Sequence, residues 1–414
     1  MMDSKFDTVV LDIETDSLNA TKIHCICVQD YATGEQKDFI QEQGCQEFIE
    51  FHNHERKYIM HNGISFDGPV LERLLGITIP LENIIDTLLI SQMINAHIDG
   101  GHSLKSWGKK LTRGGKLEFK DFEEYSEEML KYCQQDVHVT RKLMQHLAPK
   151  ITRFSVSSVR MEHRIRRIID QQEKNGFYLN VNKAHDLLEE LKTKSEDLKK
   201  DLQTIFPTIY TPRFHKTTNK PLKDHVDEFN PSSRKQIAER LQKKYDWVPS
   251  KTTPTGLPVI DEKVLKELEY PEAKMIAEYL LYEKRVSQIQ SWLKNVKDDN
   301  RVHGRVITLG CVTSRMSHYG PNMAQVPASY SPYGKECRSL WTIENPDKYC
   351  LVGSDASGLE LRCFAHYLEN PKFTEQVVDG DIHTYNQNII GLKDRPTAKT
   401  WVYAFIYGAG DAKL

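Results

Sequence analysis

The chain has 414 residues, a length that predicts two or three domains, each with its own hydrophobic core. Hydrophobic residues make up 39% and charged residues 28%, as in an ordinary globular protein, and no apolar run approaches the roughly 20 residues that cross a bilayer. The formal net charge of −2 does not exclude a nucleic-acid partner, because a cluster of metal-binding carboxylates can offset basic grooves elsewhere.

The cysteines and the first residues indicate a cytoplasmic protein. The eight cysteines are scattered; Cys25 and Cys27 are the closest pair, and no two have the paired spacing of a zinc site. The start, MMDSKFDTVVLDIET, has neither the basic segment nor the apolar core of a signal peptide. We therefore expect reduced thiols and no contact with a membrane.

The first 150 residues alternate apolar strands with helical patterns, which predicts a mixed α/β domain. The expected strands are 5–12, 23–31 and 57–60. The expected helices are 69–75, 86–94 and 126–147.

The middle of the chain is predicted to be helical. Residues 156–204 have a charged helical pattern, in which Gly176 ends the first helix. Residues 205–228 are rich in Pro, Thr and Lys without periodicity, so we expect a loop or linker there. A capped start at 230–233 leads into several helices, the last at 273–296.

Strands return near the carboxyl end. Residues 305–309 and 349–353 are expected strands, and the second leads into Ser354 and Asp355. Residues 395–407 have a helical pattern. The expected domains are 1–150, 151–300 and 301–414.

Four carboxylates and one phenol of the first domain form a candidate metal site. Asp12 and Glu14 stand two apart in a predicted strand, so both side chains leave the same face of the sheet. Asp67 stands at the entrance of a predicted helix, and Tyr132 and Asp136 are four apart on a later helix and share a face. Hard oxygen ligands favour Mg²⁺ or Mn²⁺ over zinc.

Two such ions suit phosphodiester hydrolysis: one lowers the pKa of the attacking water and the other stabilises the leaving oxygen. In that arrangement the hydroxyl of Tyr132 would orient the nucleophilic water. Taken singly, each of these residues also has an ordinary structural interpretation: a solvated strand face, a helix cap or a surface pair. For Asp86, in IIDTLLIS, a helix cap and a role in the site are about equally favoured.

The order and context of the whole set resemble the tyrosine-bearing branch of the DEDD exonuclease superfamily. A strand with Asp-x-Glu, an Asp at a helix entrance and a helical Tyr-x-x-x-Asp all occur within 140 residues. The resemblance implies an RNase H-like fold, 3′→5′ exonuclease activity and two Mg²⁺ or Mn²⁺ ions in the site.

The stretch from 301 to 407 contains the most specific motifs. VGSDASGLELRCFAH closely resembles motif A of family A DNA polymerases, in particular the replicative polymerases of short-tailed phages. The resemblance implies that Asp355 binds both Mg²⁺ ions of a polymerase site. It also implies that Glu360 packs under the sugar and rejects a 2′-hydroxyl.

Two upstream segments are similar to other parts of the same family. VTSRMSHYGPNMAQVP resembles the primer-template contact segment, in which Arg315, Asn322 and Gln325 would touch the minor groove. The family usually has glycine at the position of Ser314. FNPSSRKQI, at 229–237, matches the thumb signature.

Downstream, RPTAKTWVYAFIYGAG resembles motif B, the fingers helix that receives the nucleotide. Intervals of four place one set of side chains along a single helix face: Arg395, Lys399, Tyr403 and Tyr407. Two cations for a triphosphate and an aromatic ring for the base suit a nucleotide site. The resemblance adds His383 as a phosphate contact and assigns Tyr407 to DNA; Ala404 stands where the family has glycine.

The family's second palm carboxylate is missing from these residues. It belongs to a His-Asp-Glu turn, motif C, well after motif B, and no such string occurs here. Two dications about 4 Å apart repel by roughly 17 kcal/mol even at an effective dielectric of 20, so Asp355 alone is not expected to hold them. We expect polymerisation only with a second polypeptide that supplies motif C. A naturally split polymerase and a gene interrupted by an intron-like element both fit.

The resemblance spans residues 12–410 and implies a right-hand polymerase: an RNase H-like α/β exonuclease domain, a helical thumb, and a partial α+β palm with the start of the fingers. The expected ligands are primer-template DNA, single-stranded 3′ ends and dNTPs, in the cytoplasm of a bacterial host if a phage encodes the protein. The best-known phage relatives recruit thioredoxin through a long thumb insertion; only the short 205–228 segment occupies that place, so a thioredoxin partner is not supported.

Two other functions remain open. One is a free-standing 3′→5′ exonuclease whose polymerase remnants only bind DNA. The other is a catalytically idle accessory subunit that binds primer-template, although Asp12, Glu14, Asp67, Tyr132 and Asp136 are all present.

Overall fold

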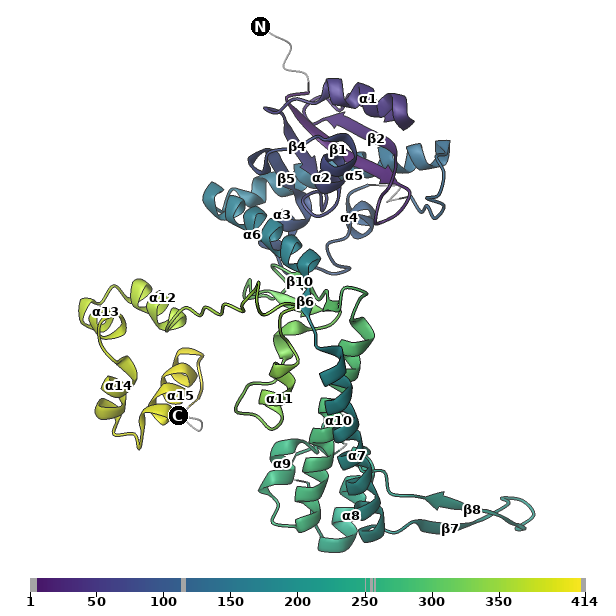
Figure 1. Ribbon diagram of the computed structural model, residues 1–414, viewed down its shortest axis with the longest axis vertical. Coiled ribbons are helices and arrows are strands. Elements are labelled where there is room, and N and C mark those ends of the chain that lie inside the picture. Colours follow the sequence, from purple (N-terminus) through teal and green to yellow (C-terminus); the bar gives the residue numbers. More distant parts are fainter. Residues whose placement is uncertain (1–5, 113–116, 250, 254–255, 257, 411–414) are drawn as a thin grey trace. The chain divides into compact units, whose positions relative to one another are not determined.

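A five-stranded sheet forms the centre of the amino-terminal part of the chain (Figure 1). The computed structural model describes residues 6–112, 117–249, 251–253, 256 and 258–410. The strand order is β3-β2-β1-β4-β5, with β1, β2 and β3 antiparallel and with β4 and β5 parallel to β1. The strands are β1 (Thr8–Thr15), β2 (Ile23–Asp30), β3 (Gln36–Ile40), β4 (Lys57–Met60) and β5 (Ile84–Asp86). The three predicted strands are confirmed, although β1 lies three residues later than expected, and β3 and β5 were not predicted.

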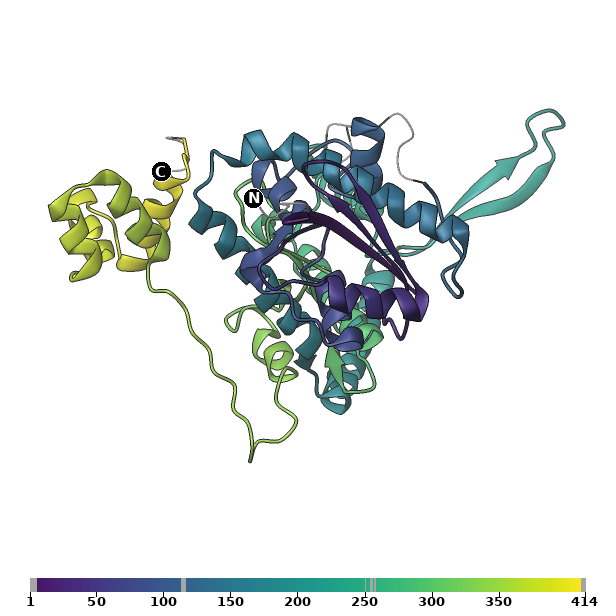
Figure 2. The same ribbon diagram turned by 90° about the horizontal axis from the view of Figure 1, so that it is seen from above.

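Helices cover both faces of this sheet, because alternate residues of β1 point to opposite sides. Val9, Leu11 and Ile13 belong to a core with α1 and α2, whereas Val10 belongs to a second core with α4 and α5. Figure 2 shows α1 and α5 on opposite sides of the strands. The helices are α1 (Gln41–Phe51), α2 (Asp67–Leu75), α3 (Thr87–Ile94), α4 (Leu104–Leu111) and α5 (Glu127–Ile151), and η1 (Leu81–Asn83) is a short 3₁₀ helix. The three predicted helices of this region are thereby confirmed.

The middle of the chain is helical, as predicted, and its longest pair of packed helices is α7 and α10. Gly176 ends α6 with a left-handed φ of 61°, and Ser233 caps α8 by accepting the backbone N–H of Gln236 at 3.4 Å. The helices are α6 (Val156–Asn175), α7 (Val181–Ile205), α8 (Arg234–Tyr245), α9 (Glu262–Glu267) and α10 (Pro271–Asn295).

The predicted linker at 205–228 is wrong over most of its length. There β7 (Ile209–Phe214) and β8 (Pro221–Asp227) form an antiparallel ribbon that extends away from the helices (Figures 1 and 2). Nearly every residue of the ribbon is exposed. Because neither face is buried, the strands have no alternation of apolar residues from which they could be recognised.

Two small strand pairs precede the last part of the chain. β6 (Phe177–Tyr178) pairs with β9 (Arg301–Val302), and β10 (Arg305–Ile307) pairs with β11 (Ser317–Tyr319) as a hairpin. The hairpin confirms the strand expected at 305–309. In its loop Ser314 has a left-handed φ of 59°, a conformation that favours glycine. The 3₁₀ helix η2 (Met323–Gln325) and α11 (Gly334–Ser339) follow.

The chain divides into two compact units, Met1–Glu344 and Asn345–Leu414. The second unit contains α12 (Leu359–Leu368), α13 (Pro371–Val378), α14 (Ile382–Ile390) and α15 (Arg395–Ile406), and α15 confirms the helix expected at 395–407. Its core is small, with Leu361, Ile382 and Val402 buried. Among the described residues, no helix is long and apolar enough to cross a membrane.

The strand expected at 349–353 is wrong. These residues have no regular structure, and Tyr349, Leu351 and Val352 are exposed. A strand is stable only when a neighbour accepts its hydrogen bonds and covers one face. Within the described part of the chain, no strand pairs with this segment.

Gly44 allows α1 to pack closely against the end of β3. A Cβ atom at this position would overlap the carbonyl carbon of Phe39 and lie 2.8 Å from its Cα. Alanine usually stabilises a helix by about 1 kcal/mol relative to glycine, but this backbone contact forces a shift of the helix. We therefore expect Gly44→Ala to lower the free energy of unfolding by about 1–3 kcal/mol, measured by urea denaturation. The exposed neighbour provides the control, because Gln43→Ala should stay within about 0.5 kcal/mol; an equally stable Gly44→Ala would contradict the packing.

Candidate functional site

Asp12 and Glu14 point from the same face of β1, as the sequence predicts. Their carboxylate oxygens and the sulfur of Cys133 all lie within 4.8 Å of one another. Glu14 is buried and Asp12 is half-buried. The structure thus places two acidic side chains side by side between β1 and α5.

Asp67 approaches the same strand from the first turn of α2. It is buried and accepts a hydrogen bond from the backbone N–H of Ile13, the residue between Asp12 and Glu14. It does not cap α2, because the cap position is Phe66. Burial raises the pKa of Asp67 to about 7, and the negative charge of Asp86 adds to the shift. Asp12, Glu14 and Asp67 are called the acidic cluster below.

Asp86 is a capping residue that also fixes the turn before Asp67. It caps α3 by accepting the backbone N–H of Leu88 at 3.0 Å. It further accepts the backbone N–H groups of Asn62 at 3.0 Å and Ile64 at 3.2 Å. Asn62 has a left-handed φ of 67°, and the bonds to Asp86 hold the turn in that conformation. Of the two interpretations of Asp86, these contacts support the cap.

Tyr132 and Asp136 lie one turn apart on α5, as expected from their spacing. Asp136 is buried, and the half-buried ring of Tyr132 contacts Phe119 and Phe122 with centroid distances of 5.8 and 6.1 Å. Between them in the chain, Cys133 has its sulfur 3.7 Å from a carboxylate oxygen of Asp12. Cys133 therefore places α5 against β1 beside Asp12.

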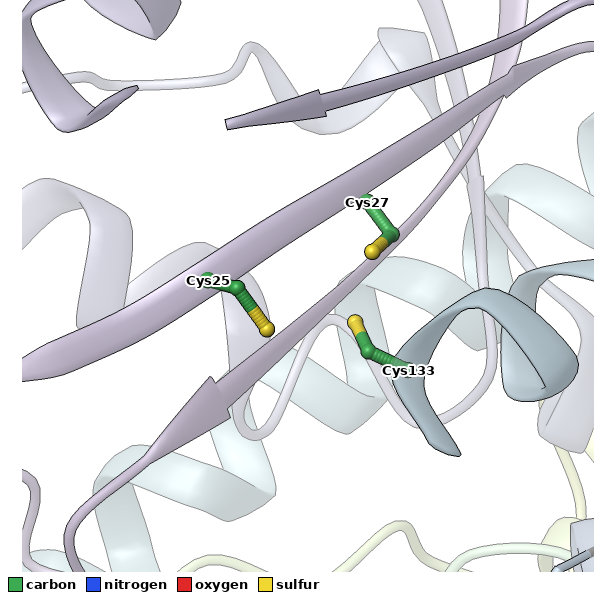
Figure 3. Close-up of side chains that lie close together, drawn as sticks. All are labelled: Cys25, Cys27 and Cys133. Atoms are coloured by element: carbon green, nitrogen blue, oxygen red, sulfur yellow. The ribbon is translucent and has the colours of Figure 1, made fainter. Parts of the chain in front are cut away.

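Three buried cysteines lie beside Asp12 and Glu14, and Figure 3 shows their side chains pointing toward one another. The sulfurs of Cys25, Cys27 and Cys133 are within 4.8 Å of one another, and in the sheet Cys27 pairs with Asp12 and Cys25 with Glu14. All eight cysteines of the chain are free, as predicted, but these three are not scattered. Burial raises the pKa of the Cys133 thiol, so that it packs as a small neutral group.

This grouping was not predicted, because the three cysteines do not have the paired spacing of a zinc site along the chain. The available signal was the Cys-x-Cys face of one strand and a helical cysteine beside Tyr132.

The acidic cluster fits divalent cations. Asp12 and Glu14 lie side by side on β1, and Asp67 accepts a hydrogen bond from the residue between them. The raised pKa of Asp67 reflects the cost of a negative charge in a buried place near Asp86. A divalent cation removes that cost, and all-oxygen donors suit Mg²⁺ or Mn²⁺.

The second unit brings together five of the predicted residues. The negative charge of Glu360, together with the larger effect of burial, raises the pKa of Tyr403, and the rings of His383 and Tyr403 are 6.1 Å apart. Burial lowers the pKa of His383, and the nearby charges of Arg395 and Lys399 lower it further. The α12–α15 cluster is the name used below for these five residues: Glu360, His383, Arg395, Lys399 and Tyr403.

Asp381 was missed by the sequence reasoning. It caps α14, and its two oxygens accept from Arg395 at 2.7 Å (Nε) and 3.1 Å (Nη2). The signal was an Asp two residues before His383, a typical cap position.

The remaining predicted residues are exposed or lie near turns. Asp355 is exposed, four residues before α12, and the exposed Tyr407 follows α15. In the first unit, the exposed Arg315 lies in the loop of the β10–β11 hairpin, and Asn322 caps η2 by accepting the backbone N–H of Ala324 at 3.0 Å. The backbone oxygen of Gln325 accepts from the side chain of Gln288 at 3.2 Å.

Comparisons with known proteins agree on one family. The family model of the 3′-5′ exonuclease matches residues 1–152, and that of DNA polymerase family A matches residues 181–414. The DNA-directed DNA polymerase of Enterobacteria phage T3 is 32% identical over an alignment of 540 positions. This alignment covers 98% of this chain and 76% of that protein. The corresponding enzyme of Escherichia phage T7 is 31% identical with the same coverage.

A solved structure has the same fold. It is the POL domain of Pol1 from M. smegmatis in complex with DNA primer-template and dNTP. The match has a TM-score of 0.72 at 14% identity, and it covers 97% of this chain and 68% of that one.

The raised pKa of Asp67 predicts a pH dependence of stability in the metal-free protein. The carboxyl has a pKa of about 7 when folded, against about 3.9 in an unfolded chain. Between these values the folded state binds more protons, so this group makes stability fall as the pH rises from about 4 to about 7. Asp67→Asn should remove this pH-dependent contribution and have a higher free energy of unfolding than the parent above pH 7. Urea denaturation in EDTA between pH 4 and 8 measures the difference, and parallel profiles for the two proteins would contradict it.

Proposed function

The chain belongs to DNA polymerase family A and contains its 3′-5′ exonuclease domain, and we propose that this domain removes nucleotides from single-stranded 3′ ends of DNA. The observation that supports this most is the convergence of Asp12, Glu14 and Asp67 on β1 beside α5. In a proofreading enzyme the substrate would be the frayed primer end, bound as a single strand through stacking and backbone contacts.

Four carboxylates would hold the metal ions of this domain: Asp12, Glu14, Asp67 and Asp136. Two Mg²⁺ or Mn²⁺ ions, when bound, supply an activated water and stabilise the leaving oxygen. The hydroxyl of Tyr132 would orient the attacking water. The buried thiol of Cys133 lies beside these proposed ligands, with its sulfur 3.7 Å from a carboxylate oxygen of Asp12.

We further propose that residues 151–300 are the thumb and 301–414 the first part of the palm and fingers. The α12–α15 cluster would bind an incoming dNTP, with His383, Arg395 and Lys399 on the triphosphate. Tyr403 would stack on the base, and Glu360 would exclude a 2′-hydroxyl. Arg395 would exchange its bond to Asp381 for a phosphate, because both are anionic acceptors for the same guanidinium.

The remaining polymerase assignments concern metal and DNA. Asp355 would bind the polymerase metal ions. Arg315, Asn322, Gln325 and Tyr407 would contact primer-template DNA. These 414 residues contain one palm carboxylate of this kind and no His-Asp-Glu segment, so nucleotide addition needs motif C from outside these residues, which a second polypeptide can supply.

The exonuclease proposal predicts the effect of removing one ligand. Asp12→Ala should lower the rate of Mg²⁺-dependent degradation of a 3′ single-stranded oligonucleotide at least about 100-fold, because an ion-binding carboxylate is lost. The assay is release of labelled nucleotides under single-turnover conditions. Glu50→Ala, which removes an exposed carboxylate on α1, is the control and should be fully active. If the parent and Asp12→Ala were equally inactive, the accessory subunit would be the better interpretation.

The polymerase proposal predicts complementation. Primer extension is expected when the chain is mixed with a polypeptide that contains motif C and the rest of a family A palm. Asp355→Asn should lower the rate of extension in the mixture at least about 100-fold, because a metal ligand is lost. The same variant should have unchanged exonuclease activity. Primer extension by the 414 residues alone would contradict the need for a second polypeptide.

A further inference from the structure

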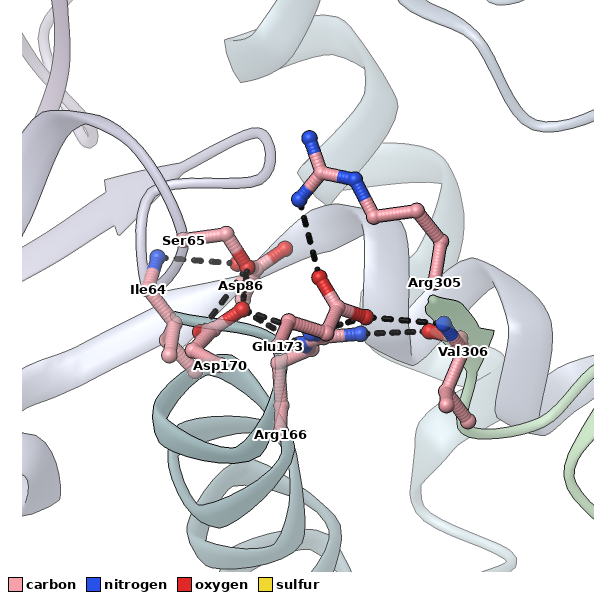
Figure 4. Close-up of polar contacts among 8 residues, drawn as sticks. All are labelled: Ile64, Ser65, Asp86, Arg166, Asp170, Glu173, Arg305 and Val306. Carbon is pink, nitrogen blue, oxygen red and sulfur yellow. Dashed lines mark hydrogen bonds and ion pairs between the residues drawn. The ribbon is translucent and has the colours of Figure 1, made fainter. Parts of the chain in front are cut away.

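Helix α6 presents three charged side chains along one face, although the acidic cluster uses none of them. Arg166, Asp170 and Glu173 are spaced by four and three residues, so they project from the same side of the helix. Their side chains are only 11%, 13% and 7% exposed. Figure 4 shows that they form one continuous set of polar contacts.

One end of this set contacts the turn that precedes Asp67. The hydroxyl of Ser65 donates to the carboxylate of Asp170, with its oxygen 2.9 and 3.0 Å from the two acceptor oxygens. Ser65 is two residues before Asp67 and directly follows Ile64, whose N–H donates to Asp86. The turn is therefore held from two directions, by Asp86 at the sheet and by Asp170 on α6.

The other end contacts the β10–β11 hairpin. Glu173 accepts the backbone N–H of Val306 at 2.8 Å, and Arg166 donates to the backbone oxygen of the same residue at 2.7 Å. Glu173 also binds the guanidinium of Arg305 at 2.9 Å. The hairpin contains Arg315 in its loop, so α6 is fixed to the segment assigned to primer-template DNA.

Arg166 joins the two ends. Its guanidinium contacts Asp170 at 2.6 Å and Glu173 at 3.1 Å. A buried charge that loses one partner is costly, and buried ion pairs of this kind define one arrangement more than they add stability. A displacement of Val306 therefore cannot leave Ser65 unaffected without breaking a buried charged contact.

We propose that Arg166, Asp170 and Glu173 form a positioning relay through which the β10–β11 hairpin sets the turn that places Asp67 in the acidic cluster. The proposal rests on the proposed exonuclease function. These three are positioning residues: none belongs to the acidic cluster, and they act through the position of Asp67. Loss of a contact should lower the rate of the chemical step and leave DNA binding unchanged.

The first test separates positioning from binding. Ser65→Ala should lower the maximal single-turnover rate on a short single-stranded oligonucleotide about 10-fold, with the half-saturating DNA concentration within about twofold of the parent. Ser65→Thr, which keeps the hydroxyl, should stay within about threefold in rate. Ser157→Ala, on the exposed start of the same helix, is the matched control. Parental activity of Ser65→Ala, or equal loss in the Thr and Ala variants, would overturn the proposal.

The second test asks whether the hairpin end influences the turn. Glu173→Gln keeps the shape of the side chain but removes the charge that binds Arg166 and Arg305, and Glu173 does not touch Ser65. Hydrogen exchange of the metal-free protein, read by mass spectrometry, should be at least about fivefold faster at the amides of Asn62 and Ile64 in Glu173→Gln, as in Ser65→Ala. Exchange at these amides in Ser157→Ala should match the parent.

The rates of the double variant complete the test. Ser65→Ala with Glu173→Gln should be no slower than the slower single variant, because both interrupt one set of contacts. Unchanged exchange at Asn62 and Ile64 in Glu173→Gln, or rate effects that multiply, would overturn the relay. A parent protein without exonuclease activity would instead overturn the proposed function, and the exchange measurement would still decide the relay.

Discussion

The convergence of Asp12, Glu14 and Asp67 on one strand is the constraint on which the amino-terminal domain depends. Two carboxylates within 4.8 Å of each other, as in Asp12 and Glu14, repel by at least about 3 kcal/mol at an effective dielectric of 20, and burial adds to that cost. The sheet tolerates this because apolar cores on both of its faces fix β1 between α1 and α2 on one side and α5 on the other. Asp86 and Ser65 then hold the turn before Asp67 through hydrogen bonds to α3 and α6, so the carboxyl cannot relax away from its neighbours.

Local patterns predicted three strands and three helices of this domain and part of the site, but they did not indicate β3, β5, α1 or α4. The period of two in β1 places Asp12 and Glu14 on one face, and the spacing of four in α5 relates Tyr132 to Asp136. The contacts that give these residues their environment were not predictable in this way. Cys133 meets Asp12 across 121 residues and Ser65 meets Asp170 across 105, and no periodicity of a single segment encodes such pairs. The charged pattern of α6 was visible in the sequence, but a solvated helix has the same pattern as one whose charges are buried against two partners.

Two segments show where local propensity fails for opposite reasons. The β7–β8 ribbon is formed by backbone hydrogen bonds alone, so its polar, exposed residues give no apolar alternation. Residues 349–353 have the composition of a strand but lack a partner among the described residues, and Leu351 and Val352 are 71% and 86% exposed. Strand formation needs a neighbour that composition cannot supply. The same segment leads into Asp355, which is therefore exposed and lies outside any strand among the described residues.

The two candidate sites concentrate charges of opposite sign, and this explains why the net charge of the chain indicated neither site. The acidic cluster is a concentration of negative charge, whereas His383, Arg395 and Lys399 concentrate positive charge in the second unit. A formal net charge of −2 is the sum of such regions and hides both. In the second unit the imbalance is partly relieved by Asp381, which binds Arg395 through two hydrogen bonds. In the first unit, burial and the negative charge of Asp86 raise the pKa of Asp67. A site that must release its ligand in every cycle, such as one for dNTPs, benefits from an internal counter-ion that competes with the triphosphate. A site for resident metal ions does not, because a competing cation would only weaken them.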